Sequence, residues 1–108
     1  MNLRSLRCFI AVAEELHFGR AAKRLNISQP PLTQHIKSLE VELGTLLFHR
    51  TKRVVRITDA GTALLDEARR LIAESDGLRH LVQRAEGGSS GYLRAGFITS
   101  SVRSRTSP

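Results

Sequence analysis

The sequence predicts a mainly α-helical fold, in which a small helical domain with one β-hairpin precedes a long helix. Apolar residues recur at steps of three and four through residues 3–43, which indicates three short helices. Between residues 47 and 57 the pattern changes to the alternation typical of short strands. From residue 64 onward the apolar residues follow a heptad pattern, which is typical of a helix that pairs with another helix.

The first two helices are predicted from their apolar faces, and we expect them over residues 3–16 and 18–25. The break between them is weakly signalled, because His17 is a poor N-cap and no proline stops the first helix. The two faces consist of Leu3, Leu6, Phe9, Ile10, Ala13 and Leu16 in the first helix, and of Phe18, Ala21, Ala22 and Leu25 in the second.

The third helix, expected over residues 29–43 with a left-handed cap at Gly44, has an unusual N-terminus. Pro30 and Pro31 are tolerated in the first turn, because backbone N–H groups there have no intrahelical partner. A serine N-cap normally accepts a hydrogen bond from one of these two positions. The Ser28 hydroxyl is therefore left available to an anion or a base edge. The simpler alternative is that the prolines only fix the direction of the helix.

The polar face of the third helix carries side chains that suit the reading of DNA bases. Glutamine can bond adenine, threonine offers a hydroxyl and a methyl for thymine, and lysine can bind guanine or phosphate. No carboxylate interrupts this face before Glu40. Two short helices, a tight turn and a helix of this kind predict a helix-turn-helix. The face consists of Gln29, Thr33, Gln34 and Lys37.

Residues 47–57 predict a β-hairpin, with two short strands around a basic turn at residues 50–53. The helix that follows is expected over residues 59–86 and would be about 40 Å long. Because no upstream segment is long enough to cover its apolar seam, we expect a symmetric dimer through this helix. The seam consists of Leu64, Ala68, Leu71, Ser75, Leu78, Val82 and Ala85.

The charge of the chain is concentrated in its first part. Residues 1–58 carry ten basic and four acidic residues, a net charge of +6, whereas residues 59–87 carry a net charge of −2. Such a basic segment suits nucleic acid or an anionic membrane surface, and a merely soluble basic surface is the simpler alternative. A single cysteine, Cys8, excludes an internal disulfide and fits a reducing cytosol. No apolar run is long enough to span a membrane.

The residues that an enzyme would need are missing. Four histidines and one cysteine offer no metal-binding spacing, and there is no glycine-rich phosphate loop, nucleophile elbow or pair of carboxylates. We therefore expect no catalysis, no metal and no cofactor. For His35 a solvent-facing position is favoured over a DNA contact, and for Cys8 a packing role is favoured over a redox role.

The motifs "RAAKRL", "SQPPLT", "LEVELGTLLFHRT" and "ITDAG" together resemble the DNA-binding region of LysR-type transcriptional regulators, and the likeness covers residues 1–87. The wording "FGRAA" and "SQPPLT" is most similar to members that respond to aromatic catabolites. The resemblance implies a winged helix-turn-helix over residues 1–58 and a dimerising linker helix over residues 59–87. Residues 88–108 would hold a hinge, the first strand of a missing effector domain and a disordered tail.

The resemblance also implies which residues touch DNA and which pair the subunits. The third helix would enter the major groove, and the basic wing would lie along the minor groove and phosphates. Many family members carry arginine at the position of Gln34, so their base preference is not transferred to this chain. The implied DNA contacts are Ser28, Gln29, Pro30, Pro31, Thr33 and Gln34 in the helix, with Lys37 added from its face, and Arg50, Thr51, Lys52 and Arg53 in the wing; the implied dimer contacts are Leu64, Ala68, Leu71, Ser75, Leu78 and Val82.

The implied partner is double-stranded DNA, bound by a homodimer at an interrupted inverted repeat. A full-length chain would add a small-molecule effector and the option of a tetramer, and the expected location is the cytoplasm, in association with the nucleoid. The alternative is a truncated dimerisation module that sequesters intact family members as heterodimers. Sequestration requires that subunits mix, whereas competition for the operator does not. A test for subunit mixing therefore separates the two functions.

Overall fold

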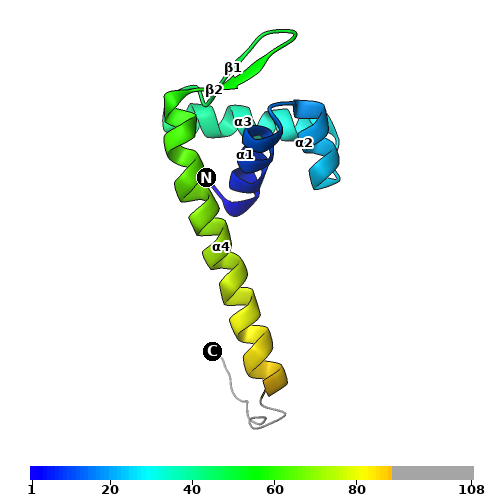
Figure 1. Cartoon of the computed structure of the whole chain (residues 1–108), viewed down its shortest axis with the longest axis vertical. Coiled ribbons are helices and arrows are strands. Elements are labelled where there is room, and N and C mark those ends of the chain that lie inside the picture. Colours follow the sequence, from blue (N-terminus) through cyan, green and yellow to red (C-terminus); the bar gives the residue numbers. More distant parts are fainter. Residues whose placement is uncertain (89–108) are drawn as a thin grey trace. The chain divides into compact units, whose positions relative to one another are not determined.

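The structure is a computed structural model that describes residues 1–88, and the expected strand at residues 92–101 and the tail lie outside the described part. Within that part, three short helices precede an antiparallel hairpin and a long helix (Figure 1). The predicted mainly α-helical fold is confirmed. The elements are α1 (Leu3–Glu15), α2 (Phe18–Leu25), α3 (Gln29–Leu43), β1 (Phe48–Arg50), β2 (Val55–Ile57) and α4 (Asp59–Gly88).

The junction between α1 and α2 is formed by two residues with unexpected roles. Leu16 adopts the left-handed conformation, with φ of 49°, and so ends α1 at Glu15. His17 then caps α2, because its Nδ1 accepts a hydrogen bond from the backbone N–H of Arg20 at 2.9 Å. Leucine rarely adopts positive φ, so this helix end has no local signal in the sequence.

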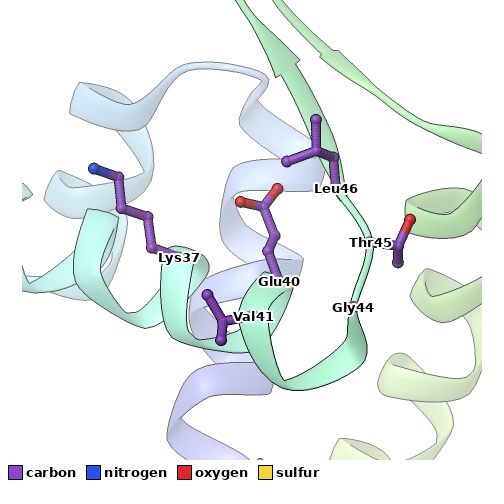
Figure 2. A pocket seen from close by; sticks show the side chains of 6 residues that line it. All are labelled: Lys37, Glu40, Val41, Gly44, Thr45 and Leu46. Atoms are coloured by element: carbon purple, nitrogen blue, oxygen red, sulfur yellow. The ribbon is translucent and has the colours of Figure 1, made fainter.

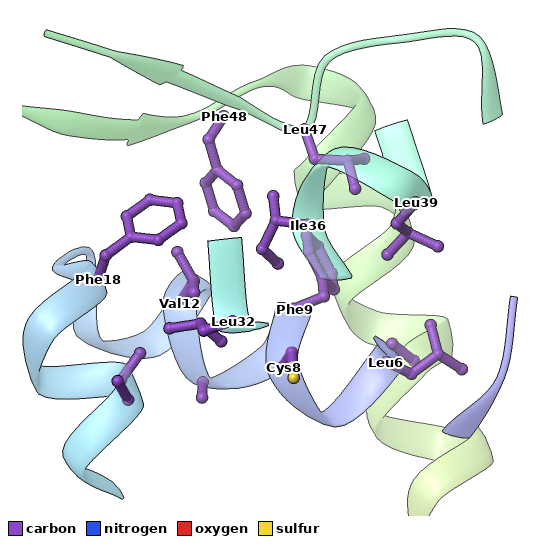
Figure 3. Packing of buried hydrophobic residues seen from close by; sticks show 14 residues of the cluster. Leu6, Cys8, Phe9, Val12, Phe18, Leu32, Ile36, Leu39, Leu47 and Phe48 are labelled. Carbon is purple, nitrogen blue, oxygen red and sulfur yellow. The ribbon is translucent and has the colours of Figure 1, made fainter. Parts of the chain in front are cut away.

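The core is built where α1, α2 and α3 meet the start of the hairpin (Figure 3). The Phe48 ring packs against the rings of Phe9 and Phe18, with centroid distances of 5.5 Å and 6.3 Å. Leu3 and Leu16, at the two ends of the apolar face expected for this helix, remain more than two-fifths exposed, and α1 ends one residue before Leu16. The fully or nearly fully buried residues are Leu6, Cys8, Phe9, Ala11, Val12, Phe18, Ala21, Ala22, Leu32, Ile36, Leu39, Leu47, Phe48 and Ala68.

The two side chains for which alternatives were open are both in contact with other elements. Cys8 is buried in the core, and this burial raises the pKa of its thiol, as expected for a packing residue. The prediction that His35 is a plain solvent-facing side chain is wrong. It is half-buried, and its Nδ1 lies 3.2 Å from the Ser5 hydroxyl of α1. The pattern of α3 alone could not reveal this contact, because the two residues are thirty positions apart.

The hairpin turn lies one residue later than predicted, at residues 51–54. Phe48 pairs with Ile57 and Arg50 pairs with Val55, so Arg50 belongs to the strand β1. The Thr51 N–H donates to the Val54 carbonyl at 2.8 Å, which closes the turn. A register one residue earlier would place the alternating apolar side chains on the opposite face of the sheet.

A buried carboxylate connects α3 to the hairpin. The Glu40 side chain is 8% exposed and accepts hydrogen bonds from the backbone N–H groups of Leu47 and Phe48, at 2.8 Å and 3.3 Å. The Arg50 guanidinium lies 3.9 Å from the same carboxylate. Because buried N–H groups are costly when they lack a partner, Glu40 holds the hairpin against the end of α3.

The junction of β2 and α4 explains the motif "ITDAG". The Thr58 hydroxyl donates to the Leu46 carbonyl at 2.8 Å and accepts from the Gly61 N–H at 3.0 Å. A Cβ at Gly61 would lie 2.5 Å from the Leu47 carbonyl oxygen and 2.7 Å from Ile57 Cγ1. Thr58 therefore caps α4, and Gly61 is needed for the close approach of the helix to the hairpin.

The first part of α4 packs against the chain's own core, which corrects the expectation that its seam is wholly uncovered. The compact unit that contains the short helices extends to Ile72, and the described residues from Ala73 onward belong to a second unit. Ala68 is fully buried, and Leu64 is half-buried against the core. The seam is uncovered only from Leu71 onward, where Leu78 and Val82 are 64% and 65% exposed.

An ion-pair network connects the first unit's helices at Glu14 of α1. Its carboxylate accepts hydrogen bonds from Arg24 of α2 at 2.5 Å and from two nitrogens of Arg69 of α4 at 3.0 Å and 2.8 Å. The hydrogen bonds from Arg24 and then Arg69 lower the pKa of Glu14. The network supplements the apolar packing of Ala68 in fixing the first half of α4.

Candidate nucleic-acid interface

A groove of about 450 Å³ separates the first turn of α3 from the hairpin. Gln29 and Thr33 line it from α3, and residues 50–55 line it from the hairpin. The segment at residues 16–19, which joins α1 to α2, closes its end. The fold thus brings together six of the predicted DNA contacts, which are distant in the sequence: Gln29, Thr33, Arg50, Thr51, Lys52 and Arg53.

The charge of this groove is entirely positive. Its lining residues include two arginines and one lysine and no aspartate or glutamate. A concave surface with charge of one sign focuses the electrostatic potential and attracts ions of the opposite sign. The groove therefore suits a polyanion.

The N-terminus of α3 has the expected unusual cap. Ser28 stands at the N-cap in an extended conformation, and its side chain makes no capping hydrogen bond. Pro30 and Pro31 follow in the first turn, and all three residues are exposed. The positive end of the helix dipole and the Ser28 hydroxyl are thus both accessible to an anion.

The predicted contacts of α3 lie on two different faces. Gln29 and Thr33 face the groove, whereas Pro30, Gln34 and Lys37 are spaced by four and three residues and share the exposed outer face. This outer face lies opposite the buried residues of the helix, so it is the surface that can approach another molecule most closely. The buried face consists of Leu32, Ile36, Leu39 and Glu40.

The cations of the wing differ in whether they already contact other groups of the chain. Lys52 and Arg53 are exposed and make no ion pair with the described part of the chain. The Arg50 guanidinium instead stacks on the Phe18 ring at 4.7 Å and lies near Glu40. Arg50 therefore joins the hairpin to α2 and α3, and Lys52 and Arg53 are the wing cations available to a ligand.

Thr51 has a structural role that its sequence position did not indicate. Its side-chain oxygen accepts hydrogen bonds from the backbone N–H groups of Arg53 and Val54, at 3.3 Å and 3.1 Å. These bonds fix the turn that presents Lys52 and Arg53. A threonine that bonds the backbone two and three residues later is a known turn-forming signal, and this signal could have placed the turn correctly.

Sequence reasoning missed the segment at residues 16–19 as part of the groove. A Cβ at Gly19 would lie 2.9 Å from His17 Cε1 and 3.7 Å from Gln29 Oε1, so the start of α2 lies directly beside the start of α3. The glycine between the His17 cap and the rest of α2 was the available signal. The role of this glycine becomes clear only when the fold brings the starts of α2 and α3 together.

Pro31 and Lys37 lie apart from the groove. Pro31 contributes to a small hollow of about 280 Å³ between α1 and α3, and Lys37 borders a shallow hollow at the end of α3 (Figure 2). None of the helices formed by residues 1–88 combines the length and the apolar character that a membrane span requires. The same residues contain no cluster of histidine, cysteine, aspartate and glutamate that could hold a metal ion.

Comparisons with known families and proteins agree on one group. The family model described as "Bacterial regulatory helix-turn-helix protein, lysR family" matches residues 3–62. The HTH-type transcriptional regulator XapR of Escherichia coli is 47% identical over 107 residues, which are 99% of this chain and 36% of XapR. BudR of Klebsiella aerogenes is 52% identical over 100 residues, which are 93% of this chain and 70% of BudR.

Solved structures give the same result. The BenM DNA-binding domain in complex with catB site 1 DNA has a TM-score of 0.75 and 41% identity, with 79% of this chain and 96% of that chain covered. The CbnR DNA-binding domain in complex with DNA has a TM-score of 0.71 and 45% identity, with 81% and 99% covered. The chain spans about a third of the length of XapR and of AlsR of Bacillus subtilis, at 36% and 34%.

Proposed function

Since the chain belongs to the LysR family of bacterial helix-turn-helix regulators, whose members are transcriptional regulators and not enzymes, we propose that it binds a specific DNA site as a dimer. The site would be an interrupted inverted repeat, because a symmetric dimer presents two copies of α3 to the duplex. Its place of action would be the nucleoid in the cytoplasm.

The positively charged groove between α3 and the hairpin is the observation that carries this proposal. Gln29 and Thr33, whose side-chain types can bond base edges, line it together with Lys52 and Arg53, which make no ion pair in the described part of the chain. Base contacts specify a sequence and phosphate contacts position the protein, and DNA-binding proteins need both. The DNA-bound relatives BenM and CbnR, which share this fold, support the same interpretation.

Seven of the predicted contacts then have a role at the DNA. Gln29 and Thr33 would read base edges from the groove side of α3, and Gln34 and Lys37 would do so from its outer face. Ser28 and the helix dipole would bind a phosphate. Lys52 and Arg53 would bind the backbone on either side of the minor groove.

Selection from a random DNA library tests this function. The wild-type chain should enrich an inverted repeat whose half-sites are about one helical turn, or about 34–36 Å, apart. A chain that enriches no sequence and binds all DNA with one affinity would have only a non-specific electrostatic function. Enrichment of a single, unrepeated half-site would instead contradict the dimer.

The wing should contribute mostly sequence-independent affinity. Replacing Arg53 by alanine should weaken binding to the selected site and to random DNA by the same factor, because the side chain has no companion suited to one base. The slope of log affinity against log salt should become less steep by about one unit for each phosphate that the variant no longer neutralises. A reduction confined to the selected site would show that Arg53 reads sequence or groove width.

A second function, the sequestration of intact family members as heterodimers, is favoured by the uncovered seam of α4. Leu78 and Val82 of the seam, and Leu81 beside it, are each more than half exposed and offer a surface to any compatible linker helix. Mixing this chain with a labelled, intact family member separates the functions. Exchange of subunits before DNA is added would support sequestration. Displacement of the intact family member from DNA without such exchange would support competition for the operator.

The likeness of "FGRAA" and "SQPPLT" to members that respond to aromatic catabolites suggests that subgroup for this chain. A small-molecule effector and a tetramer would belong only to a full-length chain of the family. The proposed DNA binding by residues 1–88 would require neither of them.

A further inference from the structure

Val41 is more exposed than any other large apolar side chain in the described part of the chain, with 81% of its surface accessible. It lies four residues after Lys37 and seven after Gln34, which places all three on the outer face of α3. Single exposed apolar residues are common on protein surfaces and need no explanation by themselves. This valine differs because it extends the helix face that would meet DNA.

A shallow hollow of about 480 Å³ lies beside Val41 (Figure 2). Leu46, which is 55% exposed, forms a second apolar wall, and Lys37 stands at the rim. Glu40 is the one acidic residue in the lining, and its carboxylate is buried and bonded to the N–H groups of Leu47 and Phe48. No free carboxylate therefore repels DNA from this hollow.

In the major groove, the 5-methyl group of thymine is the apolar feature that side chains contact. We propose that Val41 reads such a methyl group and is a specificity-determining residue, an inference that rests on the DNA-binding function proposed above. Along the helix axis Val41 lies about 10 Å from Gln34, or about three base-pair steps. The thymine would therefore lie within about three base pairs of the base that Gln34 contacts.

Replacement of thymine by uracil tests this proposal directly, because uracil keeps the pairing with adenine and lacks only the methyl group. Each thymine of the selected half-site is replaced in turn, and the affinity of the wild-type chain is measured. At one position the affinity should fall about fourfold per half-site, the value expected for one methyl group removed from an apolar environment. Substitution in both half-sites should lower it about fifteenfold, because the two effects multiply.

The variant Val41→Ala should bind the thymine and uracil forms equally at that position. Two variants serve as controls. Thr33→Ser removes another methyl group near the bases, and Val54→Ala shortens a valine of the hairpin turn that is 49% exposed. Both should keep the fourfold discrimination at the Val41 position.

Two results would overturn the proposal and leave the DNA-binding function intact. The first is a wild-type chain that binds the thymine and uracil forms equally at every position, or that distinguishes them only at a position where the Thr33→Ser variant no longer does. The second is a Val41→Ala variant that keeps the full discrimination. Failure of the DNA-binding function would be seen earlier, as a library selection that enriches no site.

Discussion

Replacing Leu71 and Leu78 by lysine should convert a dimer into monomers of half the mass in sedimentation measurements. These side chains are 42% and 64% exposed, so their replacement should leave the fold of the monomer intact. In a dimer each would be buried against the partner helix, at roughly 1.5–3 kcal/mol for a leucine. Two lysines in their place would add like charges that repel across the symmetric interface.

The same variant should bind the selected DNA site about 10²–10⁴-fold more weakly, because each half-site is then bound without the gain from a linked partner. The matched control is Ala73→Lys with His80→Lys, which adds the same charge at exposed positions outside the seam. This control should remain dimeric and keep its affinity. A dimer that persists in the Leu71 and Leu78 variant would refute the assignment of the α4 seam.

The second large effect is expected at Gly61, where alanine should destabilise the fold by about 2 kcal/mol or more. The added Cβ would lie 2.5 Å from the Leu47 carbonyl oxygen, a backbone atom that cannot rotate away. The same oxygen accepts a hydrogen bond from the Thr58 N–H at 2.9 Å, so any shift also disturbs the start of α4. The thermal midpoint should fall by roughly 10 °C at fixed protein concentration.

Gly77 is the matched control for this substitution, because it lies in the same helix and a Cβ there would meet no atom within 4 Å. Alanine at this position should stabilise the helix by up to about 1 kcal/mol, since glycine is a poor helix former. The two substitutions should therefore change the midpoint in opposite directions. Equal effects at both positions would show that helix propensity, and not the contact with the hairpin, determines the result.

Elements with a regular pattern were predictable from the sequence. The bounds of α2 and α3 follow from their apolar spacing, from Ser28 at the start of α3 and from Gly44 at its end. Gly44 has φ of 71°, which glycine adopts without strain, and this made the end of α3 readable. Leu16 adopts a similar conformation without any residue preference, so the end of α1 was less clear.

Features that depend on contacts between distant segments were not predictable. Ala68 fits the heptad pattern equally well as a dimer contact or as a core residue, and only the packed fold shows that it is buried in its own chain. Arg50 was grouped with the basic turn, but its guanidinium stacks on Phe18, which lies 32 positions earlier. The roles of Glu40 and Gly61 depend in the same way on where the hairpin begins.

The predicted DNA contacts were identified by residue type, and the fold adds their arrangement. Gln29 and Thr33 were assigned to one polar face with Gln34 and Lys37, since a helical wheel alone does not show where the hairpin lies. The structure separates the first pair, which lines the groove, from the second pair on the outer face. Which of these side chains touches a base stays a prediction.

The central claim is that α3 reads the DNA sequence, and a comparison of library selections tests it most directly. Selections with the wild type, Gln29→Ala and Thr33→Ala should give different preferred bases in each half-site. Each variant should bind the wild-type site about 1–3 kcal/mol more weakly and random DNA almost as well as before. If both variants keep the wild-type sequence and the same ratio of specific to non-specific affinity, α3 is not the reading element.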